Sequence, residues 1–193
     1  MDMHDLSEVP HSGDLRKGRV SLDDHSYFIT KCVHHAVDKP LIRPMYAKLV
    51  VSSIIWAKKQ GWWRILGFVI MPDHYHAIVG LRSARRLSSI MESINKYTAR
   101  RLNGLFQREG PFWQDGFYEH LVRDRKDYDN ILAYVHNNPV EAGLVDSPDA
   151  WEYSTAYAEY ADEIDWEWLG PTMPEIRDCK HRFAKENVPP RYW

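Results

Sequence analysis

The chain has 193 residues, of which 44% are hydrophobic, and a formal net charge of −2 at pH 7. A chain of this length is long enough for one domain with a full hydrophobic core and for additional segments outside that core. No run approaches the roughly 18 apolar residues that a membrane span needs, and the start of the chain lacks the apolar centre of a signal peptide. We therefore expect a cytoplasmic protein with no membrane association. Cys32 and Cys179 lie far apart and suggest neither a disulfide framework nor a thiolate metal site.

The first half of the chain alternates between strand-like and helix-like patterns. Aromatic and β-branched residues at 26–33 predict a first strand. Apolar residues at helical spacing predict a helix at 45–59, which ends at a glycine. The apolar stretch at 62–71 predicts a second strand, and 74–81 predicts a third strand that is antiparallel to it.

Pro72 and Asp73 separate these two strands, and proline presets the backbone of a tight turn. The turn delivers His74 and His76 to the start of the third strand. Strand side chains alternate between faces, so the two imidazoles point to one side and Tyr75 to the other. Two adjacent imidazoles can bind a divalent metal ion. Taken alone, so short a pattern is more often two partly solvated histidines on a sheet.

A second helix is predicted at 87–106, with Ser88 or Ser89 as its cap and with Tyr97 and Leu105 among its buried residues. Positions 82–108 hold seven Lys or Arg residues and one acid, whereas 141–168 hold nine acids and no Lys or Arg. One face of the molecule is thus expected to attract phosphates and another to repel them. An ordinary solvated helix surface explains the basic cluster equally well.

A fourth strand is predicted at 117–123, after an aromatic turn at 111–116. The resulting order is strand, helix, strand, strand, helix, strand. This order predicts an α+β fold in which an antiparallel sheet carries two helices on one face, the ferredoxin-like arrangement.

A third helix is predicted at 127–137, because Pro139 disfavours helical geometry in the residue before it. At about 100° per residue, Tyr134 and Asn138 border the apolar stripe of this helix, so a hydroxyl and an amide face the domain. If the helix crosses the sheet face that carries the histidines, the four side chains match a phosphodiester cleavage site. A metal ion would polarise a phosphoryl oxygen, and the phenol would attack phosphorus.

Three segments resemble the single-tyrosine HUH transposases, and specifically the REP-associated tyrosine transposases. They read VIMPDHYH at 69–76, WQDGFYEHLVR at 113–123 and YVHNNPVEAGLV at 134–145. The resemblance covers about residues 27–160. Three motifs in the family's order are far more specific than two histidines alone.

The resemblance implies a ferredoxin-like endonuclease that cleaves and rejoins single-stranded DNA at imperfect palindromic hairpins. By this resemblance His74 and His76 match the metal-binding pair, Asn138 a further metal ligand and Tyr134 the nucleophile, and Mg²⁺ or Mn²⁺ is the expected ion. The tyrosine would form a 5′-phosphotyrosine link and leave a free 3′-hydroxyl that can join strands. Tyr75 departs from the family, in which the residue between the histidines is usually aliphatic.

For DNA binding, we expect basic side chains to contact phosphates and an exposed aromatic residue to stack on unpaired bases. The expected contacts are Arg82, Arg85, Arg86, Lys96, Arg100, Arg101 and Trp113. Taken singly, an aromatic residue such as Trp113 is more often part of the core. A mobile leader at 1–24 precedes the HUH transposase domain at 25–145, and a helical extension and tail follow at 146–193. A monomer is expected, because the short connection before the third helix disfavours its exchange between subunits, and a dimer is the alternative.

Two other functions are compatible with the residues. A metal-dependent phosphodiesterase would use His74 and His76 without a covalent step. The other is a hairpin-binding protein that has lost cleavage. Formation of a covalent DNA adduct distinguishes these from a transposase.

Overall fold

The computed structural model describes residues 24–81 and 85–168. The predicted leader 1–24, apart from its last residue, lies outside these ranges, as do Arg82 and the predicted tail beyond residue 168. Four strands form one antiparallel sheet in the order β2-β3-β1-β4. They are β1 (His25–Cys32), β2 (Arg64–Ile70), β3 (His74–Leu81) and β4 (Tyr118–Leu121).

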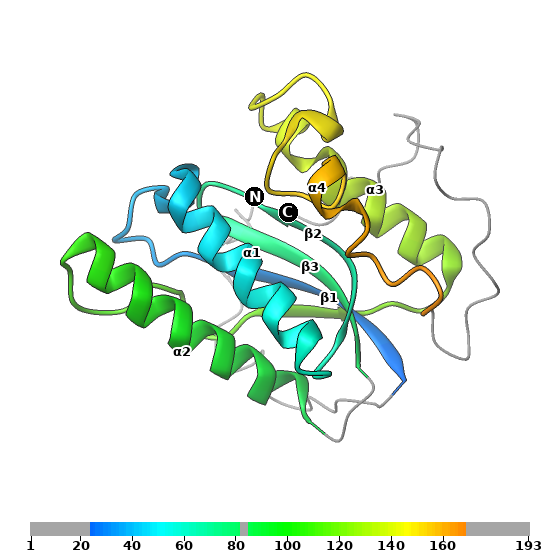
Figure 1. Ribbon diagram of the computed structural model, residues 1–193, viewed down its shortest axis with the longest axis horizontal. Helices are drawn as coiled ribbons and strands as arrows, with labels where there is room; N and C mark the ends of the chain where they lie inside the picture. The colour runs from blue at the N-terminus through cyan, green and yellow to red at the C-terminus, as the bar shows by residue number, and fades with distance from the viewer. Residues whose placement is uncertain (1–23, 82–84, 169–193) are drawn as a thin grey trace, which may run out of the picture.

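Helices cover both faces of this sheet (Figure 1). α1 (Pro44–Lys59) and α2 (Leu87–Phe106) lie side by side on one face, and α3 (Arg125–Glu141) lies on the other. In the described ranges, the connecting segments contain three short helices, η2 (Pro40–Ile42), η3 (Pro148–Ala150) and α4 (Ala158–Ala161). These features confirm the predicted ferredoxin-like α+β fold with an additional helix that carries Tyr134. None of the described helices has the length and hydrophobicity required to span a bilayer.

Alternation of side chains along the strands divides the core into two parts. On β1, Tyr27 and Ile29 belong to the cluster beneath α1 and α2, whereas Phe28 belongs to the cluster beneath α3. On β3, Tyr75 joins the first cluster and Ile78 the second. Burial of one large apolar side chain contributes about 1.5–3 kcal/mol, so both helical layers are held firmly on the sheet.

The predicted end of the third helix at residue 137 is wrong, because α3 continues to Glu141 with Pro139 inside it. Proline removes one helical donor, but the last turn keeps its other bonds. The carbonyls of Asn138 and Pro139 accept hydrogen bonds from the N–H groups of Ala142 and Leu144 at 3.0 and 2.9 Å. Pro139 is also buried, and its packing offsets part of the cost of a proline at this position.

The second helix differs from the prediction at its start and on its outer side. Arg86 occupies the N-cap position without a side-chain capping bond, so the predicted caps Ser88 and Ser89 are wrong and lie inside the first turn. Tyr97 and Leu105, which were expected to be buried, are 53% and 46% exposed. The Ile, Met and Leu side chains of one narrow stripe already fill the space between α2, α1 and the sheet.

The segment after α3 packs against β2, which is an edge strand of the sheet. The Trp151 indole donates to the carbonyl of Ile70 at 2.9 Å, and the Asp165 carboxylate accepts from the N–H of Ile65 at 2.9 Å. These bonds satisfy backbone groups that an open edge would expose to other chains. The acid-rich segment thus lies along β2 and α3, away from α2 (Figure 1).

Candidate active site

Two histidines converge at the start of β3. His74 and His76 lie two residues apart on one face of the sheet, and their Nε2 atoms are 3.1 Å apart. Tyr75 points to the opposite face, where it is fully buried beneath α2 and its hydroxyl donates to Asn95 at 3.4 Å. The predicted alternation is therefore present, and Tyr75 is not a second phenol at this site.

A neighbouring oxygen orients each imidazole through its Nδ1 atom. The Asp73 carboxylate lies 2.6 Å from Nδ1 of His74, and the Thr30 hydroxyl lies 2.9 Å from Nδ1 of His76. A carboxylate only accepts, so Nδ1 of His74 carries the proton and its Nε2 presents a lone pair in the neutral ring. If Thr30 accepts in the same way, both lone pairs face the same point, which is the arrangement that a cation stabilises.

α3 brings the predicted tyrosine and asparagine to the same place. The Tyr134 hydroxyl lies 3.3 Å from Nε2 of His76, and the side chain of Asn138, one turn further along α3, hydrogen-bonds the phenol. Phe28 packs beneath them, with its ring centroid 5.3 Å from that of His76 and 6.1 Å from that of Tyr134. The structure therefore brings together all four residues that the sequence predicts for the reaction.

Burial determines the protonation of this centre. It lowers the pKa of His76 well below its usual value, and the adjacent His74 lowers it further, so His76 is neutral at pH 7. Burial also raises the pKa of the Tyr134 phenol, although the hydrogen bond from Asn138 opposes this shift. The phenol is therefore protonated at neutral pH, and positive charge close to it would be needed to form the phenolate.

The residues of this centre fit a small divalent cation. Two ligands with bonds of about 2.1 Å to one octahedral or tetrahedral ion are about 3.0–3.4 Å apart, which agrees with the distance between the Nε2 atoms. Within the described residues there is no cluster of three or more His, Cys, Asp or Glu side chains, so a third protein ligand would have to be an amide such as Asn138. A cavity of about 350 Å³ opens beside His74.

Other polar residues of the same motifs have structural roles. Tyr128, a second phenol on α3, is fully buried and donates to the carbonyl of Leu66 at 2.9 Å. His136 lies 2.8 Å from the hydroxyl of Thr155, and its burial lowers its pKa to about 3. Neither side chain faces the histidine pair, so Tyr134 is the phenol that α3 brings to this centre.

Sequence reasoning missed the residues that orient the histidines. Asp73 is adjacent to His74, so a search for an acceptor beside each histidine could have found it. Thr30 is 46 positions from His76 and reaches it only because the two residues pair between β1 and β3. Tyr118 on β4 pairs with Thr30 in turn, and its ring contacts the ring of Phe28, which also packs against Tyr134.

The predicted DNA contacts lie elsewhere. Arg85, Arg86, Lys96, Arg100 and Arg101 are exposed on or next to α2, on the other side of the sheet from Tyr134. Lys96 pairs with Glu92 at 2.6 Å on the helix surface. The basic cluster is therefore a separate surface and does not border the histidine pair.

The expectation that Trp113 is an exposed stacking residue is wrong. Its side chain is only 6% exposed, and its indole N–H donates to the hydroxyl of Thr98 at 2.9 Å. Phe112 beside it is 1% exposed. The turn after α2 folds back beneath that helix, where the Trp113 ring contacts the Tyr75 ring with centroids 5.6 Å apart.

Comparison with known proteins agrees with this fold and this constellation of residues. Residues 22–138, more than half of the chain, match the family model described as "Transposase IS200 like", so the chain belongs to the IS200-like transposase family. Within that family it groups with the REP-associated tyrosine transposases, which its motifs resemble.

The similar proteins differ in how much of each chain is matched. The chain is 32% identical over 123 residues to the REP-associated tyrosine transposase of Escherichia coli (strain K12), a match that covers 62% of this chain and 72% of that protein. It is 34% identical over 110 residues to the Haemophilus influenzae protein named "Putative REP-associated tyrosine transposase". This match covers 50% of this chain and 62% of that protein. The chain thus spans less than two thirds of the Haemophilus protein.

A solved structure shares the fold. It is a REP-associated tyrosine transposase bound to a REP hairpin, with a TM-score of 0.62 and 22% sequence identity to this chain. The match covers 86% of this chain and 97% of that one.

Proposed function

We propose that this protein cleaves and rejoins single-stranded DNA at hairpin-forming elements through a 5′-phosphotyrosine intermediate. The observation that carries this proposal is the position of the Tyr134 hydroxyl, 3.3 Å from Nε2 of His76 and hydrogen-bonded by Asn138. A phenol, two converging imidazole nitrogens and an amide are the groups that such a reaction needs at one point.

In the proposed reaction Tyr134 supplies the nucleophile. Its hydroxyl loses its proton to solvent and its oxygen attacks a backbone phosphorus. A bond forms between that oxygen and phosphorus, and the bond from phosphorus to the 3′ oxygen breaks. The departing 3′ oxygen takes up a proton and becomes a free hydroxyl. Because the phosphotyrosine bond retains the energy of a phosphodiester, a 3′-hydroxyl can attack it in reverse, which joins strands.

His74, His76 and Asn138 are the residues that would hold Mg²⁺ or Mn²⁺. A divalent ion there would polarise a phosphoryl oxygen and favour ionisation of the nearby phenol. Asp73 and Thr30 keep the two imidazoles in the orientation in which their Nε2 atoms converge. If the side-chain amide of Asn138 donates an N–H to the phenol, the oxygen of the same amide remains available as the metal ligand.

Single-stranded DNA with hairpins is the proposed substrate. The basic residues on and beside α2 would contact its phosphates. Support also comes from the related transposase whose structure contains a REP hairpin. We further propose that a monomer is sufficient, because the phenol and both imidazoles belong to one chain and only the residues 122–124 separate β4 from α3.

A covalent-adduct assay tests the proposal. The purified protein is incubated with a labelled single-stranded hairpin and Mg²⁺ or Mn²⁺, and adducts are separated by denaturing electrophoresis. We expect an adduct with the wild type, none with Tyr134→Phe, and none after chelation until the ion is restored. Tyr128→Phe is the matched control, because it removes the other phenol of α3 and should leave the adduct.

The three candidate functions give different outcomes. A non-covalent phosphodiesterase would cleave DNA equally well with Tyr134→Phe, without an adduct. A protein that only binds hairpins would cleave with neither form. Either result would exclude the tyrosine mechanism, and only the second would leave hairpin recognition as the function.

A further inference from the structure

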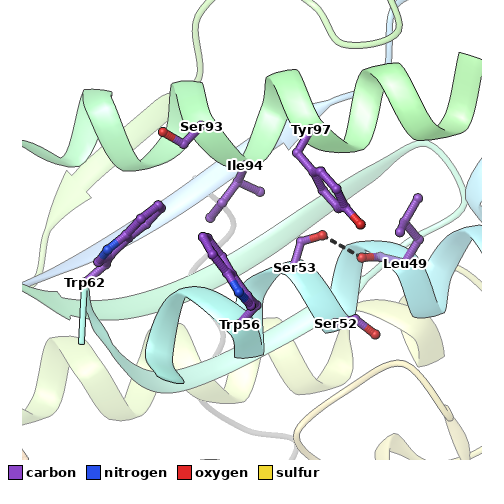
Figure 2. Close-up of a pocket in the computed structure, with 8 residues that line it drawn as sticks. All are labelled: Leu49, Ser52, Ser53, Trp56, Trp62, Ser93, Ile94 and Tyr97. Carbon is purple, nitrogen blue, oxygen red and sulfur yellow. Dashed lines mark hydrogen bonds between the residues drawn. The ribbon is translucent and has the colours of Figure 1, made fainter. Parts of the chain in front are cut away.

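The face of the sheet opposite Tyr134 carries a groove between α1 and α2 (Figure 2). Its volume is about 460 Å³. The lining consists of aromatic, aliphatic and serine side chains, which are Leu49, Ser52, Ser53, Trp56, Trp62, Ser93, Ile94 and Tyr97. Trp56 and Tyr97 are 47% and 53% exposed, so two large rings reach solvent from facing helices.

The two tryptophan rings of this groove contact each other, and a cation lies over one of them. Trp56 and Trp62 meet edge to face, with centroids 4.8 Å apart and planes at 82°. The guanidinium group of Arg85 lies 4.5 Å from the centroid of the Trp62 ring. The hydroxyls of Ser53 and Ser93 donate to carbonyls of their own helices, at 2.7 and 3.0 Å. The groove therefore offers aromatic rings more than hydrogen-bond donors. Such a surface suits flat aromatic groups and does not select among them by hydrogen bonding.

The charge around the groove is strongly positive. α1 and α2 carry six Lys or Arg residues and one acid, Glu92. Lys58 and Lys96 pair with carboxylates. The other four are exposed: Lys48 and Lys59 on α1, and Arg100 and Arg101 on α2. Each is three or four residues from a residue that lines the groove, so it lies on the same side of its helix.

We propose that this groove binds unpaired nucleotides of a single-stranded nucleic acid. The bases stack on Trp56 and Tyr97, and the phosphates lie against the lysines and arginines at the groove margins. The choice of DNA as the natural ligand rests on the proposed function. The combination of exposed rings with surrounding positive charge favours a polyanion with aromatic bases over an apolar protein segment, which would gain nothing from four cations.

Binding of a labelled oligodeoxythymidylate without a hairpin, followed by fluorescence anisotropy, tests this proposal. We expect Trp56→Ala and Tyr97→Ala each to raise the Kd by about 5-fold or more, as loss of a stacked base requires. Matched controls are Met45→Ala on α1 and Leu105→Ala on α2, which remove exposed apolar side chains that do not line the groove. These controls should bind as the wild type does.

Salt dependence and a conservative variant sharpen the test. The Kd of the wild type should rise steeply with NaCl concentration, because phosphate contacts release counterions. Trp56→Phe keeps a stacking ring and should restore most of the affinity lost in Trp56→Ala. Thermal unfolding of each variant establishes that it is folded before its Kd is compared.

The outcomes separate this inference from the proposed function. Unchanged binding in both alanine variants, or binding that does not depend on salt, would overturn the groove as a nucleic-acid site, even if the hairpin adduct forms. Groove-dependent binding without any adduct would support the groove and refute the tyrosine mechanism.

Discussion

The two faces of the sheet are built by different rules. On the α3 face, a few polar side chains from β1, β3 and α3 meet within hydrogen-bond distance, so the register of the strands decides whether the centre exists. On the α1 and α2 face, a large apolar core lies beneath helices whose outer surface is basic and aromatic. Reaction chemistry needs fixed distances, whereas a binding surface needs only suitable residues at exposed helical positions.

Charge follows the same division. The segment 141–168, with nine acids and no Lys or Arg, packs along β2 and α3, whereas the basic residues lie on or beside α2. The acidic segment and the basic residues of α2 are therefore separated in space, although Glu163 and Asp165 pair with Lys58 of α1. Attraction of phosphates by the basic surface stays a prediction. A DNA strand bound to α2 would have to pass around the β-sheet to reach Tyr134. Substitutions on the two surfaces can therefore be tested separately.

The strongest test of this comparison removes one hydroxyl from the α3 face. Thr30→Val deletes the oxygen 2.9 Å from Nδ1 of His76 without changing the shape of the side chain. Loss of such an orienting contact lowers metal affinity or activity by about 10–100-fold. We expect the rate of adduct formation to fall by this factor in single-turnover assays, and excess Mg²⁺ or Mn²⁺ to restore part of it. An unchanged rate would mean that Thr30 does not orient the ring.

The matched change on the other face should affect stability alone. Thr98→Val removes the acceptor of the buried Trp113 indole N–H, a bond of 2.9 Å. An unsatisfied buried donor costs about 1–3 kcal/mol, and we expect about 2 kcal/mol less free energy of unfolding in urea. The rate of adduct formation by the folded variant should equal that of the wild type. A slower reaction would show that the two faces are coupled.

The smallest expected effect concerns the attachment of α3. Burial raises the pKa of Asp127, but hydrogen bonds from Arg123 and His120 outweigh it and hold the pKa below its usual value. The carboxylate therefore stabilises the fold above its unfolded pKa of about 3.9, and this contribution is lost as pH falls through the lower folded value.

Asp127→Asn should accordingly lower the free energy of unfolding by about 1 kcal/mol at pH 7. The difference from the wild type should shrink in acid, below about pH 4, when denaturant unfolding is measured from pH 7 down to pH 3. Asp129→Asn, at an exposed position of the same helix, is the control and should change little. A gap that stays constant with pH would show that the charge of Asp127 contributes nothing.

Much of the architecture could be predicted from local patterns. Stretches of aromatic, β-branched and apolar residues identified the four described strands, helical spacing identified the three long helices, and the order of these elements implied the fold. Prediction from the sequence failed where the exposure of a side chain depends on packing against residues far away in the chain. Trp113 was expected to be an exposed aromatic residue of the turn at 111–116, but this turn folds back beneath α2. Pro139 reads as a helix stop, but its burial against the domain keeps α3 intact.

The sequence by itself determined the parts of the candidate site: two histidines on one side of a strand, and a phenol and an amide one turn apart on one side of a helix. These relations depend only on the repeat of a strand or a helix, which is local and fixed by backbone geometry. Only the tertiary structure decided that Thr30 orients His76, that α3 crosses the histidine face, and that Trp56 and Tyr97 share an open groove. Those relations join residues far apart in the chain, and strand register and the packing of helices on the sheet set them.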